Sequence, residues 1–116
     1  MNSLVKPITW ILGIVLLLVG ILGFVNNPIL GLFQVDAIHN SIHILSGILA
    51  LIAVSSGKSY ARLYLIIFGI VYGLVTILGF AMNGSILGIF TVNQADNYLH
   101  AAIAVVCLAV GFSSKK

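Results

Sequence analysis

Long apolar runs alternate with short polar breaks along the chain, and this pattern predicts four helices. The apolar runs cover residues 8–25, 38–54, 61–82 and 95–112, and turn-forming stretches separate them at 26–28, 55–59 and 83–85. A helix needs roughly 20 apolar residues, with a range of about 17–25, to cross the hydrocarbon core of a bilayer. An open strand would leave backbone groups unpaired in lipid. We therefore expect an all-α, integral membrane four-helix bundle.

Composition supports a membrane protein and indicates its orientation. The chain is 61% hydrophobic and only 6% charged, whereas a soluble domain has roughly 45–50% and 25%. The net charge of +3 comes from scattered residues without a basic run, so nucleic-acid binding is not expected. The positive-inside rule places both termini in the cytoplasm. Every basic residue precedes the first run, flanks the loop between the second and third runs, or follows the fourth: Lys6, Lys58, Arg62, Lys115 and Lys116.

The two halves of the sequence resemble each other. The stretch "ILGLFQVDAIHNSIH" at 29–43 aligns with "ILGIFTVNQADNYLH" at 86–100, and "ILGF" at 21–24 recurs at 77–80. The alignment predicts two tandem helical hairpins, about 8–56 and 61–112, within one transmembrane domain of residues 1–116. Since each hairpin has two spans, the halves should be related by a pseudo-two-fold axis along the membrane normal. The first run has a full-length counterpart, which argues against a cleaved signal peptide.

These motifs also carry a family resemblance. The arrangement L-G-x-F, H-N-x-x-H, "ARLY" at 61–64 and D-N-x-x-H resembles an uncharacterised family of small four-helix bacterial membrane proteins, catalogued only as a domain of unknown function. The resemblance covers nearly the whole chain. It implies a multi-pass protein of the bacterial inner (plasma) membrane, and it supplies no activity.

Polar residues collect at the starts of the second and fourth predicted helices. His39 and His43 are four residues apart and share a helix face, as do Asp96 and His100. If both faces point at the axis, six side chains converge on the outward side: His39, Asn40, His43, Asp96, Asn97 and His100. Polar groups in a membrane span usually face the bundle interior and pair there.

The ends of these helices carry capping signals. Asp36 aligns with Asn93, and both residue types are favoured at the N-cap. Asp96 follows Asn93 by three residues and is placed to close a turn like a capping box.

Four interpretations of the polar cluster remain open from sequence. In the first, Asn40, Asn97 and the imidazoles form a hydrogen-bonded clamp, and the protein has a structural or accessory role without a cofactor. In the second, His39, His43, Asp96 and His100 bind zinc or iron. In the third, His43 and His100 are axial ligands of a haem. The fourth is a histidine-based sensor of protons or pH.

Enzymatic activity is not expected, because the chain lacks the P-loop, H-E-x-x-H and nucleophile-elbow motifs. Besides the lipid bilayer, the expected partners are a second copy of the chain or a larger membrane complex. Glycine-rich faces, such as Gly69 and Gly73 of a G-x-x-x-G motif, suit close helix packing with such a partner or within the bundle.

Overall fold

The fold was obtained as a computed structural model and is described for residues 4–82 and 84–113. These residues form four helices, as the sequence predicted, and each is long and apolar enough to cross a membrane. Two short strands, β1 (Ser85–Ile86) and β2 (Phe90–Thr91), pair in antiparallel fashion and were not predicted. The helices are α1 (Val5–Leu22), α2 (Ala37–Ser56), α3 (Lys58–Ala81) and α4 (Gln94–Ser113).

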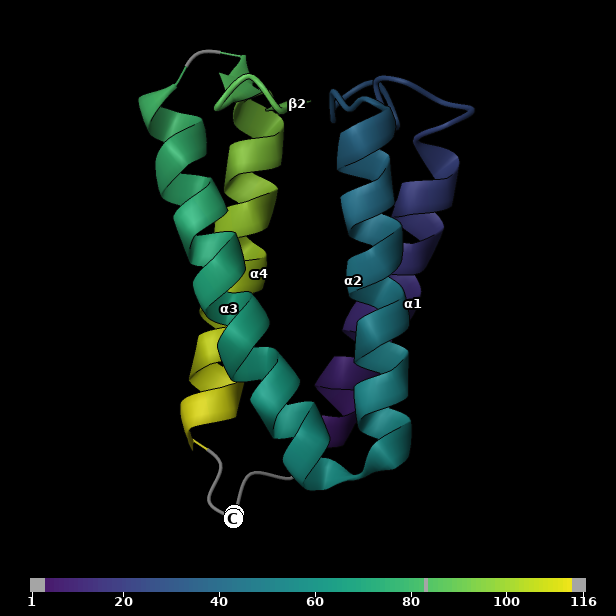
Figure 1. The fold of residues 1–116 in the computed structure, drawn as a ribbon, viewed down its shortest axis with the longest axis vertical. Coiled ribbons are helices and arrows are strands. Elements are labelled where there is room, and N and C mark those ends of the chain that lie inside the picture. The colour runs from purple at the N-terminus through teal and green to yellow at the C-terminus, as the bar shows by residue number, and fades with distance from the viewer. Residues whose placement is uncertain (1–3, 83, 114–116) are drawn as a thin grey trace.

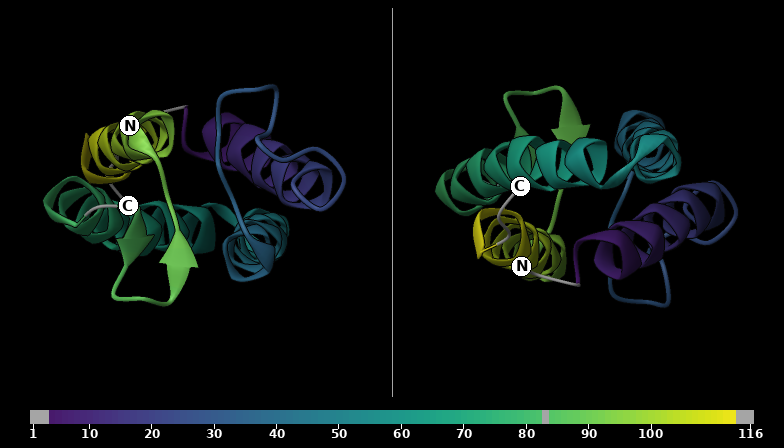
Figure 2. Two further views of the ribbon diagram at one scale, coloured as in Figure 1. Left: turned by 90° about the horizontal axis from the view of Figure 1, so that it is seen from above. Right: turned by 90° about the horizontal axis from the view of Figure 1, so that it is seen from below.

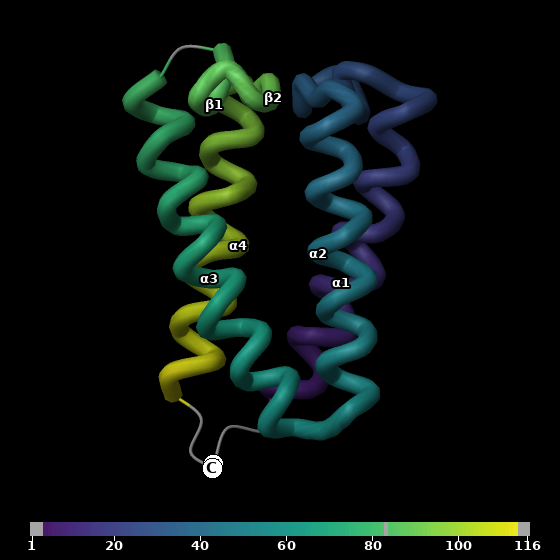
Figure 3. The backbone as a smooth tube through the Cα atoms, in the orientation of Figure 1, coloured from purple at the N-terminus to yellow at the C-terminus, as the bar shows by residue number. Residues whose placement is uncertain are grey.

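The helices form two hairpins that lean together (Figure 1). Helices α1 and α2 make one hairpin, and α3 and α4 make the other. The first turns of α3 lie against α2, and α3 then diverges from α2 towards the opposite end (Figure 3), where β2 contacts the start of α2. The start of α1, the turn between α2 and α3 and the end of α4 share one end of the molecule. Lys6, Lys58 and Arg62 therefore lie at that end, while Lys115 and Lys116 are outside the described residues.

A single residue joins α2 to α3, so both helices are longer than predicted. Gly57 stands between Ser56 and Lys58 with φ 140° and ψ 168°. This backbone conformation is essentially restricted to glycine. The predicted boundaries at 54 and 61 were too cautious, because the polar residues of "SSGKS" continue the two helices up to the glycine.

Helix α1 ends at Leu22 rather than at the predicted residue 25. The following loop is ordered by Asn27, whose amide nitrogen donates to the Val35 carbonyl at 2.8 Å and whose oxygen accepts from the Val35 amide at 3.1 Å. The sequence pattern did not reveal this exchange, because asparagine also fits an ordinary turn.

The repeated "ILG" motif forms a tight turn in each half. Leu30 and Gly31 have φ values of 53° and 72°, and the aligned Leu87 and Gly88 have 54° and 69°. Two consecutive positive φ values are those of a type I′ turn. Leucine seldom adopts this conformation, so the turn is not evident from residue type. Ile29 bridges Phe33 and, at the aligned positions, Ile86 pairs with Phe90.

Glycines permit close packing inside each hairpin. A Cβ on Gly47 of α2 would lie 2.6 Å from the backbone nitrogen of Leu17 in α1. A Cβ on Gly69 of α3 would lie 2.7 Å from Cγ of Leu108 in α4. These glycine faces are therefore used between helices of the same hairpin.

Candidate metal site

Three histidines meet between the two hairpins. His39 and His43 lie on α2 and His100 lies on α4, and the chain contains no other histidine. The ring centroids are 4.5 Å apart for His39 and His43, 5.3 Å for His39 and His100, and 5.8 Å for His43 and His100. Each side chain is only 1% exposed. One ring nitrogen from each residue can be chosen so that all three lie within 4.8 Å of one another.

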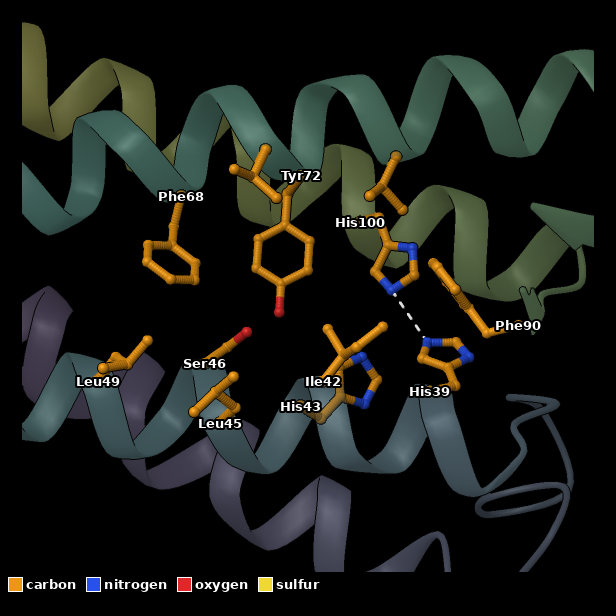
Figure 4. A pocket seen from close by; sticks show the side chains of 12 residues that line it. His39, Ile42, His43, Leu45, Ser46, Leu49, Phe68, Tyr72, Phe90 and His100 are labelled. Carbon is orange, nitrogen blue, oxygen red and sulfur yellow. Dashed lines mark hydrogen bonds between the residues drawn. The ribbon is translucent and has the colours of Figure 1, made fainter. Parts of the chain in front are cut away.

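The fold fixes the ring of His39 and its protonation. Nδ1 of His39 lies 2.7 Å from the backbone carbonyl of Thr91, at the end of β2. A carbonyl oxygen only accepts hydrogen bonds, so Nδ1 carries the proton and donates. In the neutral ring this leaves Nε2 with a free lone pair. Nε2 lies 3.4 Å from Nε2 of His100 (Figure 4).

Several ring nitrogens of the cluster lack a hydrogen-bond partner. Among the described residues, neither nitrogen of His43 has a partner, and neither does Nδ1 of His100. A buried polar atom without a partner typically costs about 1–3 kcal/mol. Coordination of a metal ion by one nitrogen of each ring would remove part of this cost.

Asp96 caps α4 and is outside the group of three. Its backbone amide donates to Oδ1 of Asn93 at 2.9 Å, and its Oδ2 accepts from the backbone amide of Asn93 at 2.9 Å. These reciprocal bonds confirm the capping box expected from the sequence. The side chains whose ligand atoms lie close enough to share one metal ion are His39, His43 and His100, and Asp96 is not among them.

Asn40 and Asn97 do not join the histidines either. Asn40 lies against Gly23, where a Cβ on the glycine would overlap its Oδ1. Asn97 lies in the same way against Gly79. Each asparagine thus packs within its own hairpin, and the oxygen atoms of both side chains lack hydrogen-bond partners among the described residues. The structure brings together three of the six residues expected to converge.

Asp36 confirms its predicted role as an N-cap and makes a second contact. Oδ1 accepts from the His39 amide at 2.8 Å, and Oδ2 accepts from the Thr91 amide, also at 2.8 Å. Burial alone would raise the pKa of this carboxyl, but the hydrogen bonds from the His39 and Thr91 amides outweigh it and lower the pKa below 3.8. The charged carboxylate therefore joins the start of α2 to β2 of the other hairpin.

An apolar cavity of about 200 Å³ adjoins the histidines between α2 and α3 (Figure 4). Exposed apolar side chains such as Leu45 and Val71 line its outer part. The Tyr72 ring stacks on His100 at 5.5 Å, and its hydroxyl has no hydrogen-bond partner among the described residues. Ligand pockets usually measure about 300–1,000 Å³. A haem between His43 and His100 does not fit, because the cavity is small and the His39 ring lies against both rings.

The spacing of the histidines suits a single metal ion. Two nitrogens that bind tetrahedral zinc at about 2.0–2.1 Å lie about 3.3 Å apart. The observed 3.4 Å between Nε2 of His39 and Nε2 of His100 matches this value. All three nitrogens lie within 4.8 Å of one another, so the wider separations would have to shorten by up to about 1.5 Å for the three to bind one tetrahedral ion.

Comparison with known proteins gives a family without a described activity. No curated protein and no solved structure matches the chain. One family model does match, over residues 6–113, and it describes a domain of unknown function, DUF4383. This match confirms the resemblance seen in the sequence, and the chain belongs to the DUF4383 family.

Proposed function

We propose that the protein is a multi-pass membrane protein that binds one divalent transition-metal ion, zinc in the first instance, between its two hairpins. His39, His43 and His100 are the protein ligands. Three imidazoles are found in catalytic and binding sites for zinc that retain an open fourth position. Here the adjoining cavity of about 200 Å³ leaves room for a water molecule or small ligand at that position.

One observation carries this proposal. All three histidines of an otherwise apolar chain are buried together, with one ring nitrogen from each inside a 4.8 Å group. The hydrogen-bonded clamp leaves both nitrogens of His43 without partners among the described residues, whereas binding of a metal would satisfy one of them. Imidazole also binds copper, iron and nickel, so these ions can compete with zinc for the three histidines.

The arrangement of the chain supports a membrane location with two related halves. Helices of 18–24 residues are about 27–36 Å long, close to the roughly 30 Å of a bilayer core. The loop after α1 and the β1–β2 hairpin lie on opposite sides of the bundle (Figure 2), as expected for a pseudo-two-fold axis along the helices. The basic residues Lys6, Lys58 and Arg62 favour cytoplasmic termini, which places the histidines in the outward half.

Metal analysis of the purified protein tests the proposal. The protein should be purified in mild detergent with a tag that contains no histidine, then equilibrated with limiting zinc and passed through a desalting column. We expect about one zinc per chain by elemental analysis, and less than a tenth of that in His39→Ala, His43→Ala and His100→Ala. Substitution with cobalt should give the visible absorption of a tetrahedral site.

Asp96→Asn provides the matched control, because Asp96 lies near the site but belongs to the capping box. It should keep full zinc stoichiometry. A folded wild-type protein that retains no zinc, copper, iron or nickel would refute the proposal. Two metal-free interpretations would then remain: a structural link, which the hydrogen bond between His39 and His100 favours, and a histidine-based sensor of protons.

A further inference from the structure

One residue of the second hairpin, Thr91, makes two backbone hydrogen bonds to the start of α2 and its N-cap. Thr91 closes β2 in the second hairpin, and both its backbone groups bond to the first hairpin. Its carbonyl accepts from Nδ1 of His39 at 2.7 Å, and its amide donates to Oδ2 of Asp36 at 2.8 Å. These two bonds fix the position of Thr91 relative to the start of α2.

Asp36 completes a closed set of hydrogen bonds among Asp36, His39 and Thr91. Its other oxygen, Oδ1, accepts from the backbone amide of His39 at 2.8 Å. The carboxylate thus bonds to the backbone of His39 on one side, and on the other to the amide of Thr91, the residue whose carbonyl orients the His39 ring. The carboxylate is ionised near neutral pH, and hydrogen bonds to a charged group are roughly twice as strong as those between neutral groups.

We infer that Asp36 and the backbone of Thr91 are the outer shell of the metal site, and that the docking of β2 on α2 and the binding of metal are coupled. This inference rests on the proposed function. Metal-binding histidines usually donate their second ring nitrogen to a carboxylate or carbonyl, which fixes the tautomer and ring orientation. The Thr91 carbonyl does this for His39, and Asp36 positions Thr91. Asp36 is a positioning residue that does not touch the metal.

The coupling follows from where the ligands sit. Two ligands belong to the first hairpin and the third, His100, belongs to the second. β2 precedes α4 in the chain, and Phe90 of β2 packs on the His39 ring at 5.2 Å. Anything that releases β2 from α2 therefore loosens the His39 ring, and a bound metal in turn holds the two hairpins together at this end.

Asp36→Asn tests the inference without removing the helix cap. Asparagine is as good an N-cap as aspartate, so its oxygen still accepts from the His39 amide, but its amide group cannot accept from the Thr91 amide. We expect cobalt affinity to fall by about 10–100-fold, the usual effect of an outer-shell mutation. The visible cobalt spectrum should also change, which a loss of stability alone would not cause.

Asn93→Asp is the matched control on the other hairpin. Asn93 also makes a bond between the hairpins, since its amide nitrogen donates to the Leu32 carbonyl at 2.8 Å. Aspartate keeps the cap of α4 and loses that bond, yet it leaves Thr91 and His39 unchanged. Its cobalt affinity should stay within about threefold of wild type, well short of the outer-shell effect.

The outcomes separate the two proposals. A wild-type protein that retains no cobalt, zinc, copper, iron or nickel overturns the proposed function and this inference with it. Cobalt binding by the wild type together with unchanged affinity and spectrum in Asp36→Asn overturns the inference alone. An equal loss in Asn93→Asp also overturns it, because the effect would then come from general docking of the loops. Far-ultraviolet circular dichroism of each variant confirms that it is folded.

Discussion

The contact between Asn97 and Gly79 predicts that alanine is tolerated less well at Gly79 than at Gly73 of the same helix. A Cβ on Gly79 would overlap Oδ1 of Asn97, whereas a Cβ on Gly73 would lie 4.0 Å from Cβ of Ala104 in ordinary contact. Both glycines are within α3. Gly79→Ala therefore pushes α3 away from α4 or forces Asn97 into another rotamer, while Gly73→Ala does neither.

The magnitude follows from these contacts. Replacing glycine by alanine inside a helix contributes about 0.5–1 kcal/mol of stability, and Gly73→Ala should show this gain. In Gly79→Ala, overpacking costs about 1–3 kcal/mol. A rotamer change also breaks the 3.1 Å hydrogen bond from Nδ2 of Asn97 to Gln94, which typically costs about 0.5–1.5 kcal/mol. Since both variants gain the helix contribution, they should differ by the overpacking cost of about 1–3 kcal/mol, or up to about 4.5 kcal/mol if the hydrogen bond is also lost, with Gly79→Ala the less stable.

Reversible unfolding in mixed detergent micelles, followed by far-ultraviolet circular dichroism, measures this difference. Metal chelator should be present so that the histidine site does not contribute. If Gly79→Ala is as stable as Gly73→Ala or more so, then Asn97 does not pack against Gly79. In that case Asn97 would be free to face the histidines, as the sequence first indicated.

Three further predictions concern the site and its surroundings. Zinc at 100 times its dissociation constant should stabilise the wild-type protein by about 2.7 kcal/mol, measured by the same unfolding assay, and should leave His43→Ala unchanged. Asp36 has a lowered pKa, so its stabilising effect relative to Asp36→Asn is complete above pH 3.8 and disappears as the pH falls through its folded-state pKa. Unfolding measured at pH 7 and at a series of pH values below 3.8 checks this, and a difference that does not shrink as the pH falls would contradict it. Tyr64→Phe removes a buried bond of 2.7 Å to the Ser46 carbonyl, so it should cost about 0.5–1.5 kcal/mol while zinc stoichiometry stays at the wild-type level.

The number and order of the helices could be predicted from sequence, because apolar run length and turn formers determine them. The caps Asp36 and Asn93 could also be predicted, since capping is a local interaction. The strands β1 and β2 could not, because they arise from leucines at positive φ rather than from a strand pattern. Each strand is only two residues long.

The candidate site was predicted only in part. The shared face of His39 and His43 follows from their spacing, but the directions of Asn40 and Asn97 do not. Helices that are apolar on every side carry little information about which face points inward. Asp96 was a candidate for both the cap and the metal, and the structure assigns its Oδ2 to the Asn93 amide. Thr91 contributes through its backbone alone, so its residue type carries no signal.

The aligned halves differ in where each places its carboxylate, and this difference explains why three histidines meet instead of a symmetric set. In the second half, asparagine occupies the cap at position 93 and the acid stands three residues later, where it returns a bond to the Asn93 amide. In the first half the acid occupies the cap itself, at Asp36, and needs no acidic partner three residues later. The residue at position 39, which aligns with Asp96, is therefore not needed for a capping box, and here it is a histidine. The spare oxygen of Asp36 bonds to Thr91 of the other hairpin, so the same exchange that introduces His39 also provides the contact that orients it.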